Sequence, residues 1–235
     1  MDYGAWASDA GRPIGAGALG VLVDNATGYG LVTARQPGTW TISTEITVDV
    51  FPELLGATNL VAESSVDHID AVGGFATARI SDQNGTLVAI GTQRCRWVPF
   101  GHTDMNRESS PTPAVPTEGD LRTLLGATLR TDGEDHVLSL TSRHELENPS
   151  RIMHGGISIT AADVVATAAL AVDGMPPLAT ASLRIGYTRA VMDGDLVEYR
   201  AVTKHRGRGL GIVEVTASVA GKTTAIVHIV ANPLS

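Results

Sequence analysis

Residues 148–172 read NPSRIMHGGISITAADVVATAALAV and carry the strongest structural signals in this chain. An Asn-Pro dipeptide, typical of a turn, opens the stretch. After His154-Gly155-Gly156, sixteen residues follow without Gly or Pro and with a single charge, Asp163. A helix built from these residues is apolar on nearly every side, so the stretch predicts a buried helix. A carboxylate inside such a helix is costly unless it is paired, hydrogen-bonded or used in chemistry.

The start of this predicted helix is suited to bind an anion. The first N–H groups of a helix have no partner within it, and the helix dipole places positive charge there. Because Gly155 and Gly156 carry no side chain, the atoms of a ligand can approach their N–H groups closely. Together these features suit a developing oxyanion. We therefore treat the stretch as a candidate catalytic site.

The composition is that of a soluble globular protein. The 235 residues are enough for one large domain or two small ones. A net charge of −8 argues against nucleic acid as a main partner. We expect no membrane partner, because no apolar run is long enough to cross a bilayer and no signal peptide is recognisable at the start. The single cysteine, Cys95, excludes an internal disulfide and fits a reducing, cytoplasmic location.

Periodicity predicts an α+β protein made of two similar halves. A largely apolar helix is expected over 17–35, and a hairpin is expected at the turn Asp82-Gln83-Asn84-Gly85. We divide the chain into a first unit over 1–100, a Pro-containing linker over 101–119 and a second unit over 120–235. Each half has a helix followed by four strands. The expected strands are 39–51, 59–67, 74–81, 86–98, 136–146, 180–191, 196–204, 211–219 and 223–230, with a short helix over 121–130.

A shift of 139 residues tests whether the halves are repeats. It places Gly17 on Gly156 and Asp24 on Asp163, so each helix starts with a glycine and carries an aspartate seven residues later. This indicates a duplicated unit, a long helix wrapped by an antiparallel sheet. Two such units would pair edge to edge and lay their helices side by side. The same shift pairs Thr41 with Thr180, Ser43 with Ser182, and Ile46 with Ile185.

Asn148, His154-Gly155-Gly156 and Asp163 stand at the spacing of a known active site. An Asn, a His-Gly-Gly six residues later and an Asp fifteen after the Asn mark the hotdog-fold acyl-CoA thioesterases of the phenylacetate-degradation (PaaI-like) type, which residues 135–230 resemble. Gly207-Arg208 before the strand GIVEV is also similar. The resemblance implies a tandem double hotdog, with two hotdog units. It also implies hydrolysis of an acyl-CoA or similar acyl thioester to a free acid and a thiol.

The resemblance implies a site shared between the units. In the family one unit supplies the Asn, the His and the Gly N–H, and the other supplies the helix carboxylate. Asn148, His154 and Gly155 or Gly156 would then face Asp24, not Asp163 of their own unit. The Gly N–H would polarise the thioester carbonyl, and Asp24 would be general base or nucleophile. Ser43 would orient the water, while Asn148 and His154 would hold the loop or assist the leaving thiolate.

A complementary site would combine Asp163 and Ser182 with Gly15-Ala16-Gly17. There Gly15 stands in place of the His, Ala16 in place of the first Gly, and Asp9 in place of the Asn. We therefore expect one competent site per chain, the one that contains Asp24.

Each signal also has a structural explanation when it is taken alone. An Asp in an apolar helix can be bonded to backbone or Ser, His-Gly-Gly can be a capped turn, and Asn before Pro is a common turn residue. Their joint spacing, with the Asp repeated in the other half, favours a site.

A basic stretch, Lys204-His205-Arg206-Gly207-Arg208, stands out in this acidic chain. It is either a solvated loop or a clamp in which Lys204, Arg206, Gly207 and Arg208 bind the phosphates of coenzyme A. Its counterpart in the first half, Asp67-His68-Ile69-Asp70, has lost the basic character.

Other functions have weaker support. The seven histidines show no ligand spacing, so we expect no metal, and no cofactor except coenzyme A as part of the substrate. A hotdog hydratase or dehydratase is disfavoured because neither Asp24 nor Asp163 has a His five residues later. The degenerate first half leaves open a non-catalytic acyl-CoA-binding or assembly subunit. Because double hotdogs usually assemble further, we expect a homodimer or homotrimer.

Overall fold

The computed structural model describes residues 8–9, 12–13, 16–99 and 119–233. The first half contains one long helix and four long strands. Its elements are α1 (Ala16–Ala34), β3 (Thr39–Val50), the 3-10 helix η2 (Pro52–Gly56), β4 (Leu60–Ile69), β5 (Gly73–Asp82) and β6 (Leu87–Pro99). Before α1, the short strands β1 (Ser8–Asp9) and β2 (Arg12–Pro13) pair with each other in a separate sheet.

The second half has the same order of elements after two additional strands. Its elements are α2 (Leu121–Leu125), β7 (Thr128–Asp132), β8 (Asp135–Thr141), the 3-10 helix η3 (His144–Leu146), α3 (Gly155–Leu170), β9 (Leu178–Tyr187), β10 (Leu196–Arg206), β11 (Gly211–Val219) and β12 (Lys222–Pro233).

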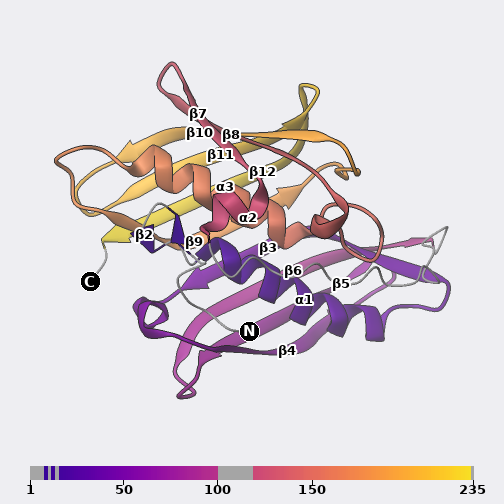
Figure 1. Cartoon of the computed structure of the whole chain (residues 1–235). Helices are drawn as coiled ribbons and strands as arrows, with labels where there is room; N and C mark the ends of the chain where they lie inside the picture. The colour runs from indigo at the N-terminus through magenta and orange to yellow at the C-terminus, as the bar shows by residue number, and fades with distance from the viewer. Residues whose placement is uncertain (1–7, 10–11, 14–15, 100–118, 234–235) are drawn as a thin grey trace.

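The two halves join edge to edge in one ten-stranded antiparallel sheet. Its strand order is β4-β5-β6-β3-β9-β12-β11-β10-β8-β7. At the junction β3 pairs with β9, so that Ile46 lies opposite Ile185 and Val48 opposite Leu183. The helices α1 and α3 lie side by side, with the strands of the first half beyond α1 and those of the second half beyond α3 (Figure 1). The predicted α+β fold, two helix-and-sheet units with neighbouring helices, is confirmed.

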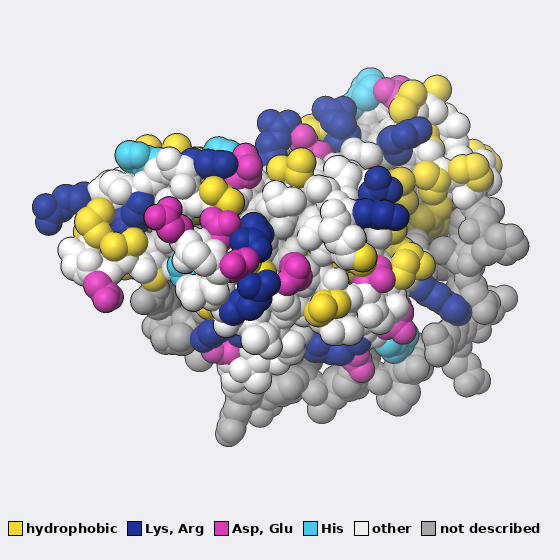
Figure 2. Space-filling view, turned by 90° about the horizontal axis from the view of Figure 1, so that it is seen from above, with side chains coloured by type: hydrophobic (Ala, Val, Ile, Leu, Met, Phe, Trp, Pro, Cys, Tyr) yellow, Lys and Arg dark blue, Asp and Glu magenta, His cyan; other side chains and the backbone are white. Residues whose placement is uncertain are grey.

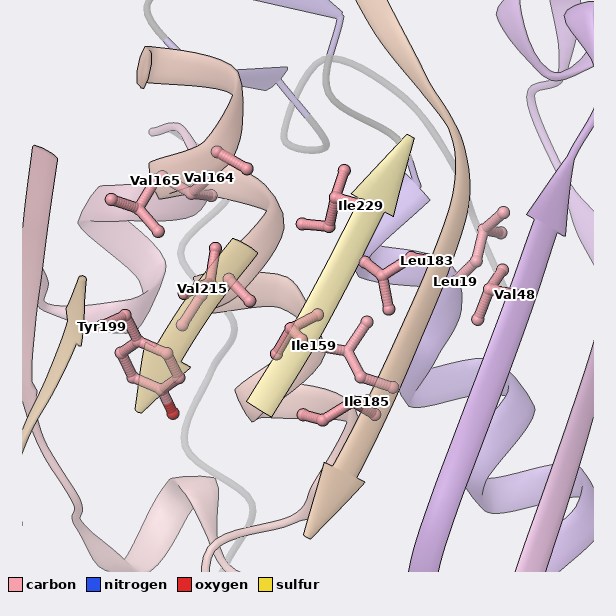
Figure 3. Close-up of a cluster of buried hydrophobic side chains, with 14 of the residues drawn as sticks. Leu19, Val48, Ile159, Val164, Val165, Leu183, Ile185, Tyr199, Val215 and Ile229 are labelled. Carbon is pink, nitrogen blue, oxygen red and sulfur yellow. The ribbon is translucent and has the colours of Figure 1, made fainter. Parts of the chain in front are cut away.

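The main hydrophobic core is shared by both units, and a smaller cluster of Leu31, Ala76, Cys95 and Trp97 lies within the first unit. Side chains from the two halves meet in a single cluster (Figure 3), and each of these is fully buried: Leu19, Val48, Ile159, Leu183, Ile185 and Ile229. The helices approach closely where Gly20 faces Ile159, because a Cβ at position 20 would lie 2.5 Å from the Ile159 Cγ2. Since the cluster crosses the junction, each unit completes the core of the other.

The predicted shift of 139 residues is right for the helices and wrong for the strands. In β3, Ser43 and Glu45 flank a bulge, and in β9 the bulge lies between Thr180 and Ser182. Ser43 therefore corresponds to Thr180, a shift of 137. The bulges after Val66 in β4 and Thr203 in β10 give the same shift. The connection from the helix aspartate to the next strand is thus two residues longer in the first half, which misaligned the sequence comparison beyond the helices.

Three predicted elements are wrong at their ends. Residues 188–191, assigned to a strand, lie beyond the end of β9 at Tyr187. Residues 128–130, assigned to a helix, lie in β7, because Gly126 ends α2 in the left-handed conformation with a φ of 64°. Residues 144–146, assigned to a strand, form η3; the chain leaves the ladder where Ser142 N–H donates to the Asp195 carbonyl. The predicted linker lies outside the described residues except for Gly119.

The surface mixes acidic and basic side chains. Figure 2 shows both signs interspersed over the face seen from above. Exposed pairs such as Arg184–Glu45 and Arg200–Asp132, each 2.6 Å apart, contribute little to stability. Among the helices of the described ranges, none is long and apolar enough to cross a membrane.

Candidate functional site

Asp24 lies on α1 at the boundary between the halves and accepts three hydrogen bonds. Its Oδ2 accepts the Gly156 N–H at 3.1 Å, from the first turn of α3. Its Oδ1 accepts from Gln93 Nε2 at 2.8 Å and from Ser43 Oγ at 3.3 Å. The strands β3 and β6 thus supply two donors from the same unit, and the helix of the other unit supplies the third. The structure brings Asp24, Ser43 and the predicted glycine motif together.

Gln93 links the Asp24 carboxylate by hydrogen bonds to Thr27 in the interior of the first unit. Its Nε2 also donates to Ser43 Oγ at 2.6 Å, and its Oε1 accepts from the Thr27 hydroxyl. Both Gln93 and Thr27 are buried. Because an ionised carboxylate can only accept hydrogen bonds, the amide nitrogen must face Asp24 and the amide oxygen must face Thr27.

The sequence analysis missed Gln93 and Thr27. The alternating pattern of β6 could have identified Gln93. It is a polar residue at an inward-facing position, between the inward-facing Gly91 and Cys95. For Thr27 the signal is its place one turn after Val23 on the buried stripe of α1.

His154 caps α3 and lies beside Asp24. Its Nδ1 accepts the Gly156 N–H at 3.1 Å and lies 3.2 Å from Asp24 Oδ2. Its Nε2 is 3.1 Å from Asn25 Oδ1. Only 15% of the His154 side chain and 11% of the Asp24 side chain are exposed. Both ring nitrogens are therefore held, with Nδ1 facing the carboxylate.

Gly155 supplies the open donor of the site. As the first residue of α3, its N–H has no acceptor within the helix, and no backbone or side-chain acceptor for it is found in the part of the chain that the structure describes. A Cβ at this position would lie 2.7 Å from Asp24 Oδ2 and 2.8 Å from Tyr187 Oη, so only glycine fits.

Tyr187, a third residue that the sequence analysis missed, fixes the Gly155 peptide. Its hydroxyl donates to the Gly155 carbonyl at 2.8 Å. Burial, with the nearby Asp24 charge, raises the pKa of Tyr187 well above its ordinary range. The hydroxyl therefore keeps its proton and remains a donor.

Asn148 shapes the loop that leads into α3. Its Oδ1 accepts from the Ser150 N–H at 2.9 Å, and its own N–H donates to the Ile152 carbonyl at 2.8 Å. This turn also holds Arg151 in the left-handed region with a φ of 59°. Asn148 borders the pocket described next, and its contacts fit the predicted role of holding the loop.

A pocket of about 380 Å³ opens beside these residues, and its lining combines buried and exposed side chains. Asp24, Ser43, Gln93 and His154 all border it. Its buried lining, here called the inner end, includes Met153, Ser158, Val191, Thr224 and Ala225. The mouth is lined by exposed ones, which include Tyr29, Ile42, Arg96, Thr188 and Arg189. A mostly apolar inner end together with polar groups suits an acyl compound.

Asp163 occupies the equivalent position on α3 in closed surroundings. Its Oδ2 accepts the Gly17 N–H at 2.8 Å and its Oδ1 accepts from Thr180 Oγ1 at 2.5 Å. Thr180, not the predicted Ser182, is therefore its partner from the strand. Asp163 is fully buried and does not line the pocket, and burial raises its pKa above the ordinary value.

The polar network behind Asp24 is not repeated behind Asp163. Gln93 lies opposite Ile46 in β6, and the equivalent place in β12, opposite Leu183, is taken by Ile229. Thr27 corresponds to Ala166. Gly15 and the side chain of Asp9, which the sequence placed at this second site, lie outside what the structure describes.

The predicted phosphate clamp does not lie at this pocket. Arg206 donates from Nε to the Leu170 carbonyl at 2.8 Å and from Nη2 to the Pro176 carbonyl at 2.6 Å, which caps the end of α3. Lys204 pairs with Glu214 at 3.4 Å. None of Lys204, Arg206, Gly207 and Arg208 lines the pocket, because the end of α3 lies away from the His-Gly-Gly start of the helix. Over the described residues, no group of three or more His, Cys, Asp or Glu side chains could hold a metal ion.

Two family models match the chain, one on each half. Residues 151–226 match the thioesterase superfamily, and residues 2–96 match the acyl-CoA thioesterase C-terminal domain. A search of curated proteins found no match.

Two similar solved structures cover both halves, and a third covers about one half. The acyl-CoA thioesterase II TesB2 from Mycobacterium marinum is 12% identical, covers 94% of this chain and 90% of its own, and has a TM-score of 0.62. A putative oleoyl thioesterase from Lactobacillus plantarum is 11% identical, covers 84% and 78%, and has a TM-score of 0.59. The E. coli PaaI protein is 21% identical over 48% of this chain and 83% of its own, with a TM-score of 0.46. The first two likenesses show that the tandem arrangement is a double hotdog.

Proposed function

We propose that this chain is a thioester hydrolase that cleaves an acyl-CoA at the site around Asp24. The thioesterase family models that match each half, together with the double-hotdog fold, support this proposal. The products are the free acid and the coenzyme A thiol. The observation that carries the proposal is the hydrogen bond between Asp24 Oδ2 and the Gly156 N–H, which places a carboxylate of one unit at the helix start of the other.

The Gly155 N–H polarises the thioester carbonyl. It is the open donor at the start of the sixteen-residue helix α3, where the helix dipole adds positive charge. The charge that develops on the carbonyl oxygen during attack is stabilised there more than the neutral carbonyl is. Tyr187 supports this donor by holding the carbonyl of the same residue.

Asp24 activates the attacking water. As general base it takes a proton from water while the water oxygen forms a bond to the carbonyl carbon. The carbon–sulfur bond then breaks, and the thiolate receives a proton, so the sum is acid and thiol. Ser43 and Gln93 hold Oδ1 and thereby direct Oδ2 toward the pocket. In the nucleophilic alternative the same oxygen forms an anhydride that water cleaves.

A single turnover in water labelled with oxygen-18 separates the two routes. Label that enters the Asp24 carboxylate supports the nucleophilic route, and label that enters only the acid product supports the general base. Neither route needs a bound cofactor, and coenzyme A enters as part of the substrate. A cytoplasmic location and assembly into a homodimer or homotrimer remain predictions.

Thiol release from a panel of acyl-CoAs tests the function. We expect Asp24→Asn to lose on the order of 100-fold or more in kcat. Asp163→Asn is the matched control, because Asp163 has the equivalent helix position but does not line the pocket; it is assayed below its unfolding temperature. Loss of turnover in Asp163→Asn alone would contradict the assignment to Asp24. A wild type that binds acyl-CoA and never releases thiol would point to a binding subunit.

A further inference from the structure

Two arginines at the mouth of the pocket have no partner in the described part of the chain. Most other described arginines are engaged, such as Arg184 with Glu45, and Arg206 with main-chain carbonyls. Arg96 and Arg189 are exposed, contact no carboxylate or carbonyl with their side chains, and both line the pocket. In a protein with a net charge of −8, these side chains leave two positive charges at one opening without internal compensation.

The two arginines come from different units. Arg96 lies on the outward-facing side of β6, opposite Ile42 of β3. Arg189 follows the end of β9, and its main-chain N–H donates to the Thr224 carbonyl at 3.3 Å. The mouth is therefore assembled at the same junction as the Asp24–Gly156 contact.

The position equivalent to Arg96 in the second unit is not basic. Ala179 corresponds to Ile42 by the shift of 137, and its partner in β12 is Asn232. At this strand position the basic residue thus occurs only in the unit that carries the Gln93 network. Since the second unit has the same fold without a basic residue at this position, the fold itself does not require Arg96.

The burial of the pocket lining sets the direction in which a thioester would enter. The inner end, with Val191 and Ala225, is nearly closed to solvent, whereas the mouth is exposed. With the reacting carbonyl at the Gly155 N–H, the acyl group occupies the inner end and the thiol carrier extends through the mouth. The carrier therefore passes the two arginines.

We propose that Arg96 and Arg189 bind the phosphate groups of the thiol carrier. Guanidinium groups match phosphate oxygens in charge and in geometry, and desolvated phosphates need such donors. The proposal rests on the proposed function and assigns its carrier subsite to the junction of the units. The phosphates can be those of coenzyme A or the single phosphodiester of a protein-bound phosphopantetheine, and these two sources share the same chemistry.

Kinetics with one acyl group on different carriers test the proposal. The carriers are coenzyme A, 3′-dephospho-coenzyme A, pantetheine 4′-phosphate and pantetheine, and the variants are Arg96→Ala, Arg189→Ala and the double variant. We expect KM for the acyl-CoA to rise about tenfold for each arginine removed, with little change in kcat. KM for the acyl-pantetheine, which has no phosphate, should not change. In the wild type, KM for the acyl-CoA should rise with ionic strength, and this dependence should weaken in the double variant.

Arg79→Ala and Arg208→Ala are the matched controls. Both arginines are exposed, have no partner among the described residues and do not line the pocket. An equal rise of KM in these controls, or an unchanged KM for the acyl-CoA in the double variant, would overturn the proposal. A KM effect that persists with pantetheine 4′-phosphate supports contact with the phosphate next to pantetheine. An effect confined to coenzyme A supports contact with the nucleotide phosphates.

Measuring the affinity for coenzyme A directly tests the arginine subsite independently of the proposed hydrolysis. Calorimetry should show about tenfold weaker binding for each single variant, even if no thioester is hydrolysed. Hydrolysis of the acyl-pantetheine, together with equal coenzyme A affinity in the wild type and the double variant, would retain the thioesterase and reject the arginine subsite. Failure of every thioester would reject the proposed function, and the calorimetric comparison would still decide the subsite.

Discussion

The Asp24 carboxylate accepts the N–H of Gly156 at 3.1 Å, across the junction of the two halves. The reciprocal contact, from the Gly17 N–H to Asp163, measures 2.8 Å. The two contacts are related by the internal repeat, yet only Asp24 borders a pocket. What distinguishes them is the surroundings, because Gln93 and His154 contact Asp24, whereas Asp163 is fully buried beside Thr180.

Replacement of Gln93 should impair turnover through Asp24. In Gln93→Leu the carboxylate and Ser43 lose the donor that orients them, so we expect kcat to fall about 10- to 100-fold while KM changes little. The pH profile of kcat should also change, since the variant alters the environment of the base. Steady-state kinetics over a range of pH measure both effects. Ile90→Ala, on the same strand and outside the pocket, is the control for general damage to β6, and a profile equal to the wild type in Gln93→Leu would refute this role.

Gly155→Ala should disable the site without unfolding the protein. The new Cβ would meet Asp24 Oδ2 and Tyr187 Oη within 2.8 Å, so the helix start or the carboxylate must move. A displacement of that kind costs on the order of 100-fold in kcat. Gly28→Ala is the control, because Gly28 also lines the pocket but its nearest contact would be 3.7 Å away. Equal activity of the two variants in the thiol-release assay would contradict the prediction.

Stability should decline in alkali through buried tyrosines. Burial raises the pKa of Tyr199 to about 12, although a hydrogen bond to Ser158 opposes the shift. Since the folded pKa lies above the ordinary value near 10, the contribution is fully present below about pH 10 and is lost as the pH rises toward 12, by up to about 1.4 kcal/mol per pH unit. In Tyr199→Phe this part of the decline should disappear. Urea unfolding at several pH values from 8 to 11.5 measures it, and an unchanged slope in the variant would reject the assignment.

Two buried threonines should respond oppositely to replacement by valine. The Thr224 hydroxyl is buried without a hydrogen-bond partner among the described residues, so Thr224→Val should stabilise the protein by about 1 kcal/mol. Thr160 Oγ1 lies 2.9 Å from the carbonyls of both Gly17 and Gly156, so Thr160→Val should destabilise it by about 1–2 kcal/mol. Thermal unfolding of the two variants gives the comparison. A loss of stability in Thr224→Val would indicate that its hydroxyl is bonded in solution.

Much of the site could be predicted from local patterns. The glycine pair, the apolar run and the lone Asp163 predict a buried helix with an open start, and α3 begins at Gly155. The same pattern in the first half located α1 and Asp24. Ser43 was found with them, but its assigned counterpart Ser182 was wrong, because a shift derived from the helices cannot detect two extra residues in a loop.

Local sequence patterns are enough to predict the two helix-and-sheet units and their order, because alternation and apolar runs depend on neighbours a few residues apart. The motif comparison favoured Asp24, but only the folded chain shows which side chains leave that carboxylate open and Asp163 closed. Gln93, Thr27 and Tyr187 reach the Asp24 site from separate elements, and Arg206 turns to the end of α3 and away from the pocket. Contacts of this kind depend on how the sheet brings β3, β6 and β9 around the antiparallel helices. The spacing of residues along the chain does not reveal which side chains will meet at the Asp24 site, because the packing of the shared core sets the distances between them.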